Sequence, residues 1–465
     1  MTALWTSADV AAATGGRVTT GFAATGVSID TRSLAAGDLF IAIKDARDGH
    51  DFVADAFARG AAAAMVSETP RDVGPEAPLL HVEDTLAGLR SLGNAGRQRS
   101  SASVVAVTGS VGKTSTKEAL AAVLGAQGPT HAAAASFNNH LGVPLTLARL
   151  PQGALFAVVE IGMNHPGEIA PLARLAAPHV ALITTVEAVH IAHFESEEAI
   201  ADEKGAIMEG LVPGGAVVLN RDNRHFARLT ALAHARGVGR IITFGTDPMA
   251  DVRLLSWQAE GWSMRVHIGL LGREYETVLA SPGVHAARNA CGVLATVFAA
   301  GADPAAALPV LAAIAPAGGR GRRRTIPLPG GEATLLDDSY NASPPSVRAA
   351  LAVLGTAPAA RRIAVLGDML ELGERAEQDH RALAEPIAAA GIDSVFCCGG
   401  LMRGLYDALP ARLRGGYAAD STALLPLVRP ALLAGDVVLV KGSLGSRMGP
   451  LAAALAGDAP GGAKG

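Results

Sequence analysis

The sequence has few cysteines, few aromatic residues and no excess of charge. Only three of its 465 residues are cysteines, and Cys397 and Cys398 are adjacent, so the chain can form neither a disulfide framework nor a four-thiolate metal site. Lys and Arg total 39 against 43 Asp and Glu, and the net charge of −4 argues against a cationic protein that binds nucleic acid. Because aromatics make up 4%, the cores must be aliphatic. The composition is typical of a reduced, intracellular protein.

Targeting and membrane-spanning segments are also missing from the sequence. The first residues lack the basic and apolar regions of a secretory signal. The most apolar stretch, 290–317, is interrupted by Gly301, Pro304 and Pro309, which predicts two short buried helices instead of one membrane span. We therefore expect a cytoplasmic protein without a membrane span.

The length and the changes in composition predict three domains of about 150 residues each. A turn-rich segment at 69–78 and a polar segment at 97–103 together predict the first boundary, and a segment rich in Gly and Arg at 316–324 predicts the second. The predicted domains are 1–99, 100–315 and 316–465.

One unit recurs along the second and third of these domains: a short apolar run, then polar or Gly residues, then an Ala-rich helical segment. Apolar strands that alternate with helices are typical of βαβ units, so the sequence predicts an α/β fold with buried parallel sheets. In such sheets, ligands bind beyond the carboxyl ends of the strands. The predicted strands include 104–107, 156–159, 180–183, 217–219, 335–336, 363–366, 395–396 and 437–440.

A Gly-rich loop follows the predicted strand 104–107 and leads into a helical pattern at 116–124. The loop consists of Gly109, Ser110, Val111, Gly112, Lys113, Thr114 and Ser115. Backbone N–H groups and the helix dipole would face phosphates, Lys113 would add a positive charge and the Thr114 hydroxyl could ligate Mg²⁺. The alternative is an ordinary βα turn with a surface lysine. The complete order of strand, loop and helix favours an ATP site.

Carboxylate and histidine side chains further along the chain predict a metal site. Glu160 ends the predicted strand 156–159, and a carboxylate beside a phosphate loop is a usual ligand of a divalent cation. His190 and His193 could suggest zinc, but no Cys lies near and no strong third ligand accompanies them, so two ordinary loop histidines are the alternative. Lys204 follows in a helical pattern at 195–207, where the sequence alone indicates a solvated side chain.

The shortened loop Thr-Gly-x-x-Gly-Lys-Thr at 108–114 resembles that of the Mur ligase family, which couples ATP hydrolysis to amide-bond formation. The segment Asp337–Pro344 (DDSYNASP) is similar to the Asp-Asp-Ser-Tyr-Asn-Ala-Asn-Pro signature of one branch of the family, with Ser343 in place of the second Asn. The Asp-Asn-Pro-Arg motif of diaminopimelate-adding relatives is absent. Segments 363–373 and 438–447 complete a likeness that extends over nearly the whole chain.

This resemblance implies an architecture and an activity. The expected architecture is a small N-terminal α/β domain that binds a UDP-sugar, a central P-loop ATPase domain with a parallel sheet, and a C-terminal Rossmann-like domain. The expected cofactors are ATP and Mg²⁺, and the expected substrates are UDP-N-acetylmuramoyl-tripeptide and D-alanyl-D-alanine, used in peptidoglycan synthesis. An acyl phosphate would form and be attacked by the amine after closure about the 316–324 hinge. A monomer is expected.

The resemblance also implies roles for individual residues. The expected catalytic residues are Lys113, Glu160, His190 and Lys204. Thr114 is expected to ligate one Mg²⁺, and Glu160, His190 and Lys204, the last as a carbamate, are expected to ligate a second. Besides the 109–115 loop, the expected nucleotide contacts are Asn289, Arg320 and Asp338. The expected substrate contacts are Thr31, Arg32, Ser33, Asn138, Asn139, Asn341 and Ser343.

Three other interpretations stay open from the sequence. The chain could be another amide ligase of the same family with a different amino substrate, a nucleotide-dependent switch or ATPase that forms no bond, or a nucleotide-binding interaction protein with a degraded site. Departures from the family pattern at Ala286, Ser343 and Leu444 allow the last of these. The intact phosphate loop and the expected metal ligands argue against it. The ligase interpretation requires the four expected catalytic residues to lie beside the 109–115 loop.

Overall fold

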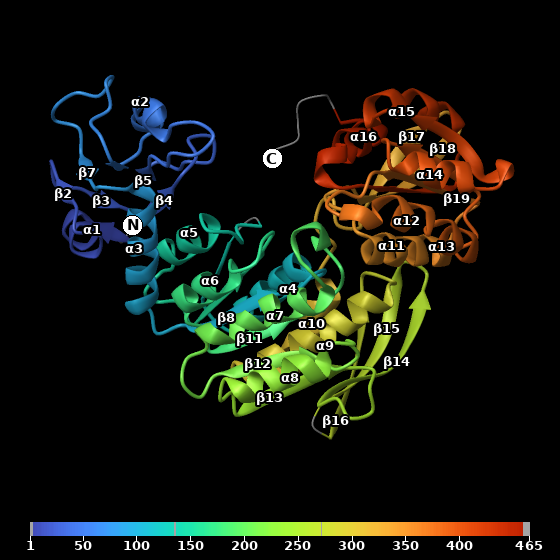
Figure 1. The fold of residues 1–465 in the computed structure, drawn as a ribbon, viewed down its shortest axis with the longest axis horizontal. Helices are drawn as coiled ribbons and strands as arrows, with labels where there is room; N and C mark the ends of the chain where they lie inside the picture. Colours follow the sequence, from blue (N-terminus) through green and yellow to red (C-terminus); the bar gives the residue numbers. More distant parts are fainter. Residues whose placement is uncertain (1–2, 134–135, 271, 459–465) are drawn as a thin grey trace.

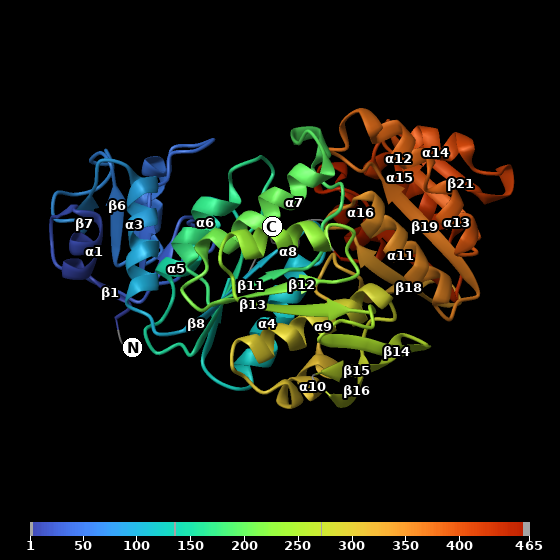
Figure 2. The same ribbon diagram turned by 60° about the horizontal axis from the view of Figure 1, so that its bottom comes forward.

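The computed structural model describes residues 3–133, 136–270 and 272–458. Three α/β domains with separate main sheets follow one another along the chain, and the central domain lies between the other two (Figures 1 and 2). The predicted α/β class with three domains is therefore confirmed. Within the described ranges, no helix has the length and apolar character that crossing a membrane requires.

The N-terminal domain contains a five-stranded sheet in the order β2-β7-β6-β5-β4, in which β4 to β7 are parallel. Its strands are β2 (Arg17–Val18), β4 (Gly26–Ser28), β5 (Asp38–Ile41), β6 (Ala63–Val66) and β7 (Leu79–His81), beside a separate pair, β1 (Trp5–Thr6) and β3 (Ala23–Ala24). Its helices are α1 (Ser7–Thr14), α2 (Val53–Ala58) and α3 (Thr85–Gln98). The segment 69–78 joins β6 to β7 within this sheet, so it marks no change of domain.

The central domain contains a nine-stranded sheet in the order β16-β15-β14-β13-β12-β11-β8-β10-β9. Its strands are β8 (Ser103–Thr108), β9 (Thr130–Ala132), β10 (Phe156–Glu160), β11 (Val180–Ile183), β12 (Ala216–Asn220), β13 (Arg240–Gly245), β14 (Val252–Glu260), β15 (Ser263–Leu270) and β16 (Arg273–Leu279). Its helices are α4 (Lys113–Gly125), α5 (Gly142–Ala148), α6 (Ile169–Ala176), α7 (Glu197–Gly205), α8 (Phe226–Ala235), α9 (Val284–Ala299) and α10 (Pro304–Ala313). Residues 104–107 of β8 are all buried, as expected for a strand covered on both faces.

Two features of the central domain differ from the sequence-based expectation. Strands β14 to β16 pair antiparallel at one end of the otherwise parallel sheet and were not predicted. Burial in β15 alternates strictly along the strand, which is typical of a sheet with one covered face. The two helices predicted within 290–317 are present as α9 and α10, but Pro309 lies inside α10 instead of interrupting it.

The C-terminal domain contains a six-stranded sheet in the order β17-β18-β22-β19-β20-β21, parallel except for β17. Its strands are β17 (Arg322–Leu328), β18 (Gly331–Asp338), β19 (Arg361–Gly367), β20 (Ser394–Cys398), β21 (Arg414–Ala418) and β22 (Asp436–Lys441). Its helices are α11 (Pro344–Thr356), α12 (Ala376–Arg381), α13 (Ala384–Ala389), α14 (Met402–Ala408), α15 (Ser421–Val428) and α16 (Met448–Leu455). Residues 322–324, the end of the segment rich in Gly and Arg that predicted the second boundary, belong to β17.

The N-terminal and central domains pack closely through α3 and α5. The Cβ of an alanine at Gly93 would lie 2.8 Å from the Pro144 carbonyl oxygen, and one at Gly96 would lie 2.2 Å from the Leu147 carbonyl oxygen. The Trp5 indole N–H donates to the Ala148 carbonyl oxygen at 2.8 Å. Helix backbones can approach this closely only where side chains are absent, so the glycines of α3 permit the close packing of the two domains.

Replacing Gly96 by alanine is expected to lower the stability of the fold by about 1–3 kcal/mol, as overpacking does. The new Cβ would meet backbone atoms of Leu147, which can move only with the whole of α5. Calorimetric unfolding measures the change. Gly404→Ala in α14 is the matched control, because nothing lies within 4 Å of its Cβ. Alanine favours a helix over glycine by about 1 kcal/mol, so the control should be neutral or more stable. Equal losses in both variants would contradict the close α3–α5 packing.

Candidate active site

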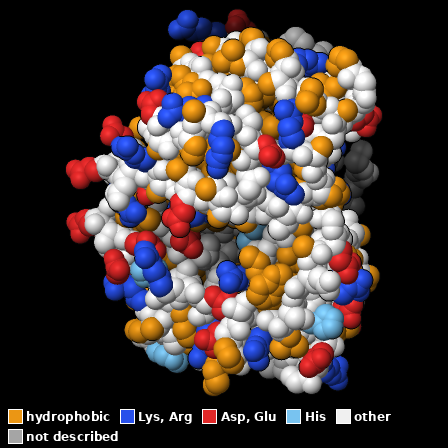
Figure 3. All heavy atoms as spheres, turned by 90° about the vertical axis from the view of Figure 1, so that its right-hand side faces the viewer, with side chains coloured by type: hydrophobic (Ala, Val, Ile, Leu, Met, Phe, Trp, Pro, Cys, Tyr) orange, Lys and Arg blue, Asp and Glu red, His pale blue; other side chains and the backbone are white. Residues whose placement is uncertain are grey.

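The carboxyl ends of strands from two sheets meet at one cavity of about 1070 Å³ between the central and C-terminal domains. Parallel strands place their carboxyl ends at one edge of a sheet, where ligands bind. The cavity is lined from the central domain by Ser110, Glu160, Thr184 and Asn220 and from the C-terminal domain by Asp338 and Lys441. Viewed from the C-terminal side, the surface is hollowed between interspersed acidic, basic and hydrophobic side chains (Figure 3).

The phosphate loop is held in an open shape by glycines and by hydrogen bonds to the next strand. Gly109 and Gly112 have φ angles of +146° and +88°, which favour glycine. The Thr184 hydroxyl donates to the Val111 carbonyl oxygen at 2.7 Å. Lys113, the first residue of α4, donates through Nζ to the Gly109 carbonyl oxygen at 2.7 Å. Among the described residues no side chain caps α4, so its first N–H groups are available to an anion.

Glu160 lies beside this loop at the carboxyl end of β10. Its Oε1 accepts hydrogen bonds from the Thr114 hydroxyl at 3.2 Å and from the Asn138 side-chain amide at 2.7 Å. The side chain is 1% exposed, and within the described residues its Oε2 has no hydrogen-bond partner. A buried carboxylate oxygen without a partner is costly unless a cation binds it. The pair of Thr114 and Glu160 therefore fits a divalent metal ion, which prefers oxygen ligands.

His190 lines the same cavity from the loop after β11. Its ring nitrogen Nδ1 is hydrogen-bonded to the carboxylate of Glu371, which comes from the C-terminal domain. Burial lowers the pKa of His190, the Glu371 carboxylate opposes this shift, and the positive charges of Lys113 and Lys204 add to it. A neutral imidazole keeps a lone pair for a metal ion, so this environment favours a ligand. His193 packs instead against His165, with ring centroids 4.5 Å apart.

Lys204 is buried in α7, so the expectation of a solvated side chain was wrong. The residue is 2% exposed. Burial lowers its pKa well below the usual value, and the charge of Lys113 lowers it further. A neutral amine is the form that reacts with CO₂ to give a carbamate. The Lys204 charge also lowers the pKa of His190, but Lys204 does not line the cavity as the described residues define it.

Replacing Lys204 by methionine is expected to raise the Tm of the metal-free protein in CO₂-free buffer. A lysine in an unfolded chain has a pKa of about 10.4, so below that pH unfolding lets the side chain take up a proton that the folded state binds poorly. The stability of the wild type therefore rises with pH in this range, whereas the variant lacks this dependence. The Tm advantage should be largest at the acidic end of a pH series and shrink towards pH ~10. A difference independent of pH would contradict the pKa shift.

The remaining expected nucleotide contacts gather around the same loop. A Cβ at Gly112 would lie 2.9 Å from Asn289 Nδ2, so this side chain packs directly on the phosphate loop. Arg320 donates to the Ser136 hydroxyl at 3.3 Å, and its guanidinium lies 4.2 Å from the centroid of the Tyr340 ring. Arg320 thus joins the central domain to the C-terminal domain beside the cavity.

The C-terminal wall of the cavity is organised by Lys441. Its Nζ donates to Asp338 Oδ2 at 2.6 Å and to the Asn341 carbonyl oxygen at 3.0 Å. Ser343, which precedes α11, lines the cavity, and its backbone N–H donates to the Ser346 hydroxyl at 2.9 Å. Polar groups of this wall therefore face the phosphate loop across the cavity.

Four of the expected substrate contacts lie outside the cavity lining defined by the described residues. Thr31, Arg32 and Ser33 follow β4 in the N-terminal domain, where Arg32 forms an ion pair with Asp30. Asn139 is exposed, and its Oδ1 accepts from the Leu141 and Gly142 N–H groups at the start of α5. This is a local helix-capping role. The substrate roles of these four residues stay predictions.

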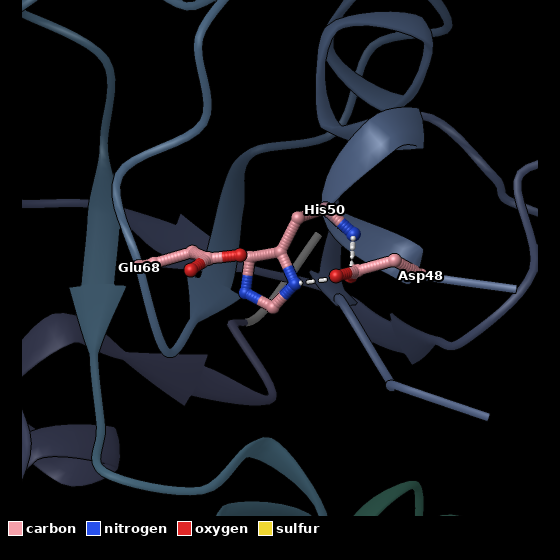
Figure 4. Close-up of side chains that lie close together, drawn as sticks. All are labelled: Asp48, His50 and Glu68. Atoms are coloured by element: carbon pink, nitrogen blue, oxygen red, sulfur yellow. Dashed lines mark hydrogen bonds and ion pairs between the residues drawn. The ribbon is translucent and has the colours of Figure 1, made fainter.

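A second group of metal-type ligands lies in the N-terminal domain and is already internally satisfied. Asp48, His50 and Glu68 place ligand atoms within 4.8 Å of one another (Figure 4). However, His50 Nδ1 is bonded to Asp48 at 2.6 Å, and its Nε2 accepts from the Ser67 N–H at 2.9 Å. The Lys44 ammonium lies 3.1 Å from Glu68 and 3.6 Å from Asp48. Both ring nitrogens of His50 are already hydrogen-bonded, and the Lys44 ammonium already pairs with the two carboxylates. This group is therefore a structural cluster.

Sequence reasoning missed Glu371 and Trp262. Glu371 follows the carboxyl end of β19 by a few residues, a position that could have drawn attention to it. Trp262 lies at the β14–β15 turn, lines the cavity and has the guanidinium of Arg323 5.3 Å from its ring centroid. Because the antiparallel strands were not predicted, no sequence signal pointed to this residue.

Comparison with known proteins agrees with this architecture. Three domain families match the chain: the Mur ligase family catalytic domain at 23–95, the Mur ligase middle domain at 107–297, and the Mur ligase glutamate ligase domain at 321–444. The UDP-N-acetylmuramoyl-tripeptide–D-alanyl-D-alanine ligase of Escherichia coli is 36% identical over 92% of this chain and 93% of the relative.

Solved structures give the same result. The crystal structure of MurF from Acinetobacter baumannii superposes with a TM-score of 0.84 at 28% identity, covering 97% of this chain and 98% of the other. MurF ligase from Thermotoga maritima in complex with ADP has the same fold, with a TM-score of 0.74 at 24% identity over 93% of this chain and 96% of the other. The chain belongs to the Mur ligase family.

Proposed function

We propose that the chain is an ATP-dependent, ADP-forming ligase that joins the peptide carboxylate of UDP-N-acetylmuramoyl-tripeptide to D-alanyl-D-alanine. The observation that carries the proposal is the buried Glu160 carboxylate, with one oxygen lacking a partner among the described residues, beside a phosphate loop in a cavity shared by two domains. Relatives that match over nearly their full length are UDP-N-acetylmuramoyl-tripeptide–D-alanyl-D-alanine ligases, which supports this reaction. Together these support a ligase of peptidoglycan precursor synthesis.

Nucleotide binding is assigned to the 109–115 loop and its neighbours. The backbone N–H groups at the start of α4 and the Lys113 ammonium would hold the β- and γ-phosphates of ATP. Asn289, which packs on Gly112, would contact the adenine end. Arg320 and Asp338 would complete the nucleotide contacts from the hinge and the C-terminal domain.

Thr114 would hold one Mg²⁺, and Glu160, His190 and Lys204 as its carbamate would hold a second. The neutral Lys204 amine adds to CO₂ and releases a proton, which replaces a potential positive charge by a negative one. When bound, Mg²⁺ supplies charge that neutralises the γ-phosphate and the substrate carboxylate. The lowered pKa of Lys204 supports this set of ligands, as does Glu160 Oε2, which has no partner in the part of the chain that the structure describes.

The chemistry then depends on positioning. The substrate carboxylate attacks the γ-phosphorus of ATP, ADP leaves, and the dipeptide amine displaces phosphate from the acyl phosphate. Asn138, which is hydrogen-bonded to Glu160, would orient the carboxylate, while Asn341 and Ser343 would contact the amino substrate. Lys441, which lines the cavity, or Arg447 would bind the carboxylate of the dipeptide. Closing the two domains would exclude water from the acyl phosphate.

We further propose the domain boundaries 1–99, 100–315 and 316–465, with Thr31, Arg32 and Ser33 facing the UDP end of the substrate. The position of these three residues in a separate small domain supports this role. We propose that the chain acts as a monomer in the cytoplasm, because the cavity is formed within one chain and all three cysteines are free and buried.

The decisive experiment supplies ATP, Mg²⁺, the UDP-linked tripeptide and D-alanyl-D-alanine, and follows phosphate release together with the pentapeptide product. Phosphate release should require both the UDP-linked tripeptide and D-alanyl-D-alanine. Glutamate and diaminopimelate, tested in parallel with their own UDP-linked precursors, should give no product. Phosphate release that is indifferent to the dipeptide would refute ligation and indicate an ATPase or switch.

A further inference from the structure

We infer that Glu371 of the C-terminal domain is a positioning residue for His190, so that domain closure and cation binding are coupled. The inference rests on the proposed function, in which His190 is a ligand of Mg²⁺. It adds a residue from a different domain to the site and assigns it a mechanical role.

The contact joins two short loops that lie 181 residues apart in the sequence. His190 immediately precedes a 3₁₀ helix, η2 (Ile191–His193), and Glu371 lies just before another, η4 (Gly373–Arg375). These two turns are in contact, and the segment before α7 reaches the C-terminal domain near α12 (Figures 1 and 2). The carboxylate of Glu371 is hydrogen-bonded to His190 Nδ1.

The backbone at both ends of this contact is held in an unfavourable conformation. In the described chain, four residues other than glycine have a positive φ, and two of them are His190 at 61° and Glu371 at 63°. Each such conformation costs of order 1 kcal/mol and is maintained only where surrounding structure requires it. A Cβ at Gly373 would lie 3.3 Å from Ala192 Cα, so the backbones of the two loops approach closely. The two positive φ angles and the close approach of the two loops thus all occur beside one interdomain hydrogen bond.

The hydrogen bond determines which nitrogen of His190 can bind a cation. With Nδ1 donating to Glu371, the ring carries its proton on Nδ1 and leaves Nε2 as the available ligand atom. Histidines that bind metals commonly donate their other N–H to a carboxylate, which fixes the tautomer and the ring orientation. Here the carboxylate arrives only when the C-terminal domain is in contact with the central domain. By thermodynamic reciprocity, closure strengthens cation binding by the same factor as the cation favours closure.

Replacing Glu371 by alanine is expected to weaken Mn²⁺ binding about tenfold, the lower end of the effect of losing such a partner. Mn²⁺ replaces Mg²⁺ because its free concentration can be measured by EPR, with a non-hydrolysable ATP analogue present. Glu371→Gln should retain most of the affinity, because an amide oxygen still accepts from Nδ1. The exposed Glu374, on the same loop, is the matched control, and Glu374→Gln should bind like the wild type.

Two results of this titration would separate the inference from the proposed function. If His190→Ala weakens Mn²⁺ binding but Glu371→Ala does not, Glu371 has no positioning role and the inference is overturned. If His190→Ala also binds normally, the proposed metal site fails, and the inference fails with it. Loss of affinity in both variants, with retention in Glu371→Gln, supports the inference.

The coupling to closure is measured by distances between nitroxides at Ala235→Cys in α8 and Ala388→Cys in α13. Both positions are exposed, and the native cysteines are buried and should not react. Mg²⁺ with the ATP analogue should enlarge the population with the short interdomain distance. The factor by which Mg²⁺ raises the ratio of the short-distance to the long-distance population should be about tenfold smaller in Glu371→Ala than in the wild type. This matches the expected loss of cation affinity. A distance distribution unaffected by Mg²⁺ in the wild type would overturn the coupling.

Discussion

Replacing Lys204 by alanine should lower kcat of the ligase about 10³-fold or more. Metal-ion stabilisation of a transition state is worth several kcal/mol, and each ~1.4 kcal/mol corresponds to a factor of ten in rate. In the proposed site, the Lys204 carbamate is one of few ligands that hold the cation. Steady-state kinetics with saturating ATP measures the loss.

Small carboxylates should restore part of this activity. Truncation at Cβ leaves a buried space in place of the lysine chain, which propionate or butyrate can occupy with its carboxylate near the carbamate position. The wild type should lose activity in bicarbonate-depleted buffer and recover it when bicarbonate returns. Asp202 lies on α7, the helix that carries Lys204, and forms a surface ion pair with Arg228 of α8. The variant Asp202→Asn is therefore the control and should remain active. An active Lys204→Ala enzyme would eliminate the carbamate from the mechanism.

Replacing Lys113 by alanine should also lower kcat/KM for ATP about 10³-fold, the upper range for the loss of one charged donor to a developing negative charge. The Lys113 ammonium is held at the mouth of the phosphate loop by the Gly109 carbonyl oxygen. Burial lowers its pKa, while the Glu160 carboxylate favours the charged form. Lys113→Arg should be nearly as defective, because a planar guanidinium does not fit where a compact ammonium does.

Binding measurements give this prediction its specificity. Calorimetric titration of Lys113→Ala should show weak binding of the ATP analogue but unchanged binding of the UDP-linked tripeptide, since the UDP end is assigned to the N-terminal domain. Lys44→Ala, which removes a half-exposed lysine of that domain's structural cluster, should leave nucleotide binding unchanged. Equal loss of both ligands in Lys113→Ala would indicate a damaged fold instead of a phosphate contact.

The phosphate loop and Glu160 could be predicted because their signals are local. A loop between a strand and a helix is contiguous in sequence, and its glycines and Lys113 keep their spacing whatever surrounds them. Glu160 was found by its position after an apolar run. The structure brings Glu160 to hydrogen-bond distance of Thr114, 46 residues away, because β10 and β8 are adjacent parallel strands with aligned ends.

Lys204 shows where sequence reasoning alone was misled. An isolated lysine among Glu197, Glu198, Asp202 and Glu203 is typical of an exposed helix face. Its burial depends on how α7 packs against α8 and the central sheet, which no local pattern records. Only the family resemblance suggested a special role. The strands β14 to β16 were missed for a related reason: an alternating pattern at the edge of a sheet is weaker than a continuous apolar run.

The sequence by itself determined the α/β class, the order of three domains, the phosphate loop and the strand-end carboxylate, because each is written in a few consecutive residues. Only the tertiary structure decided that Lys204 is buried and that Glu371 meets His190 across a domain boundary. These outcomes depend on contacts between segments distant in the chain, where burial and charge are set by the packing of whole domains.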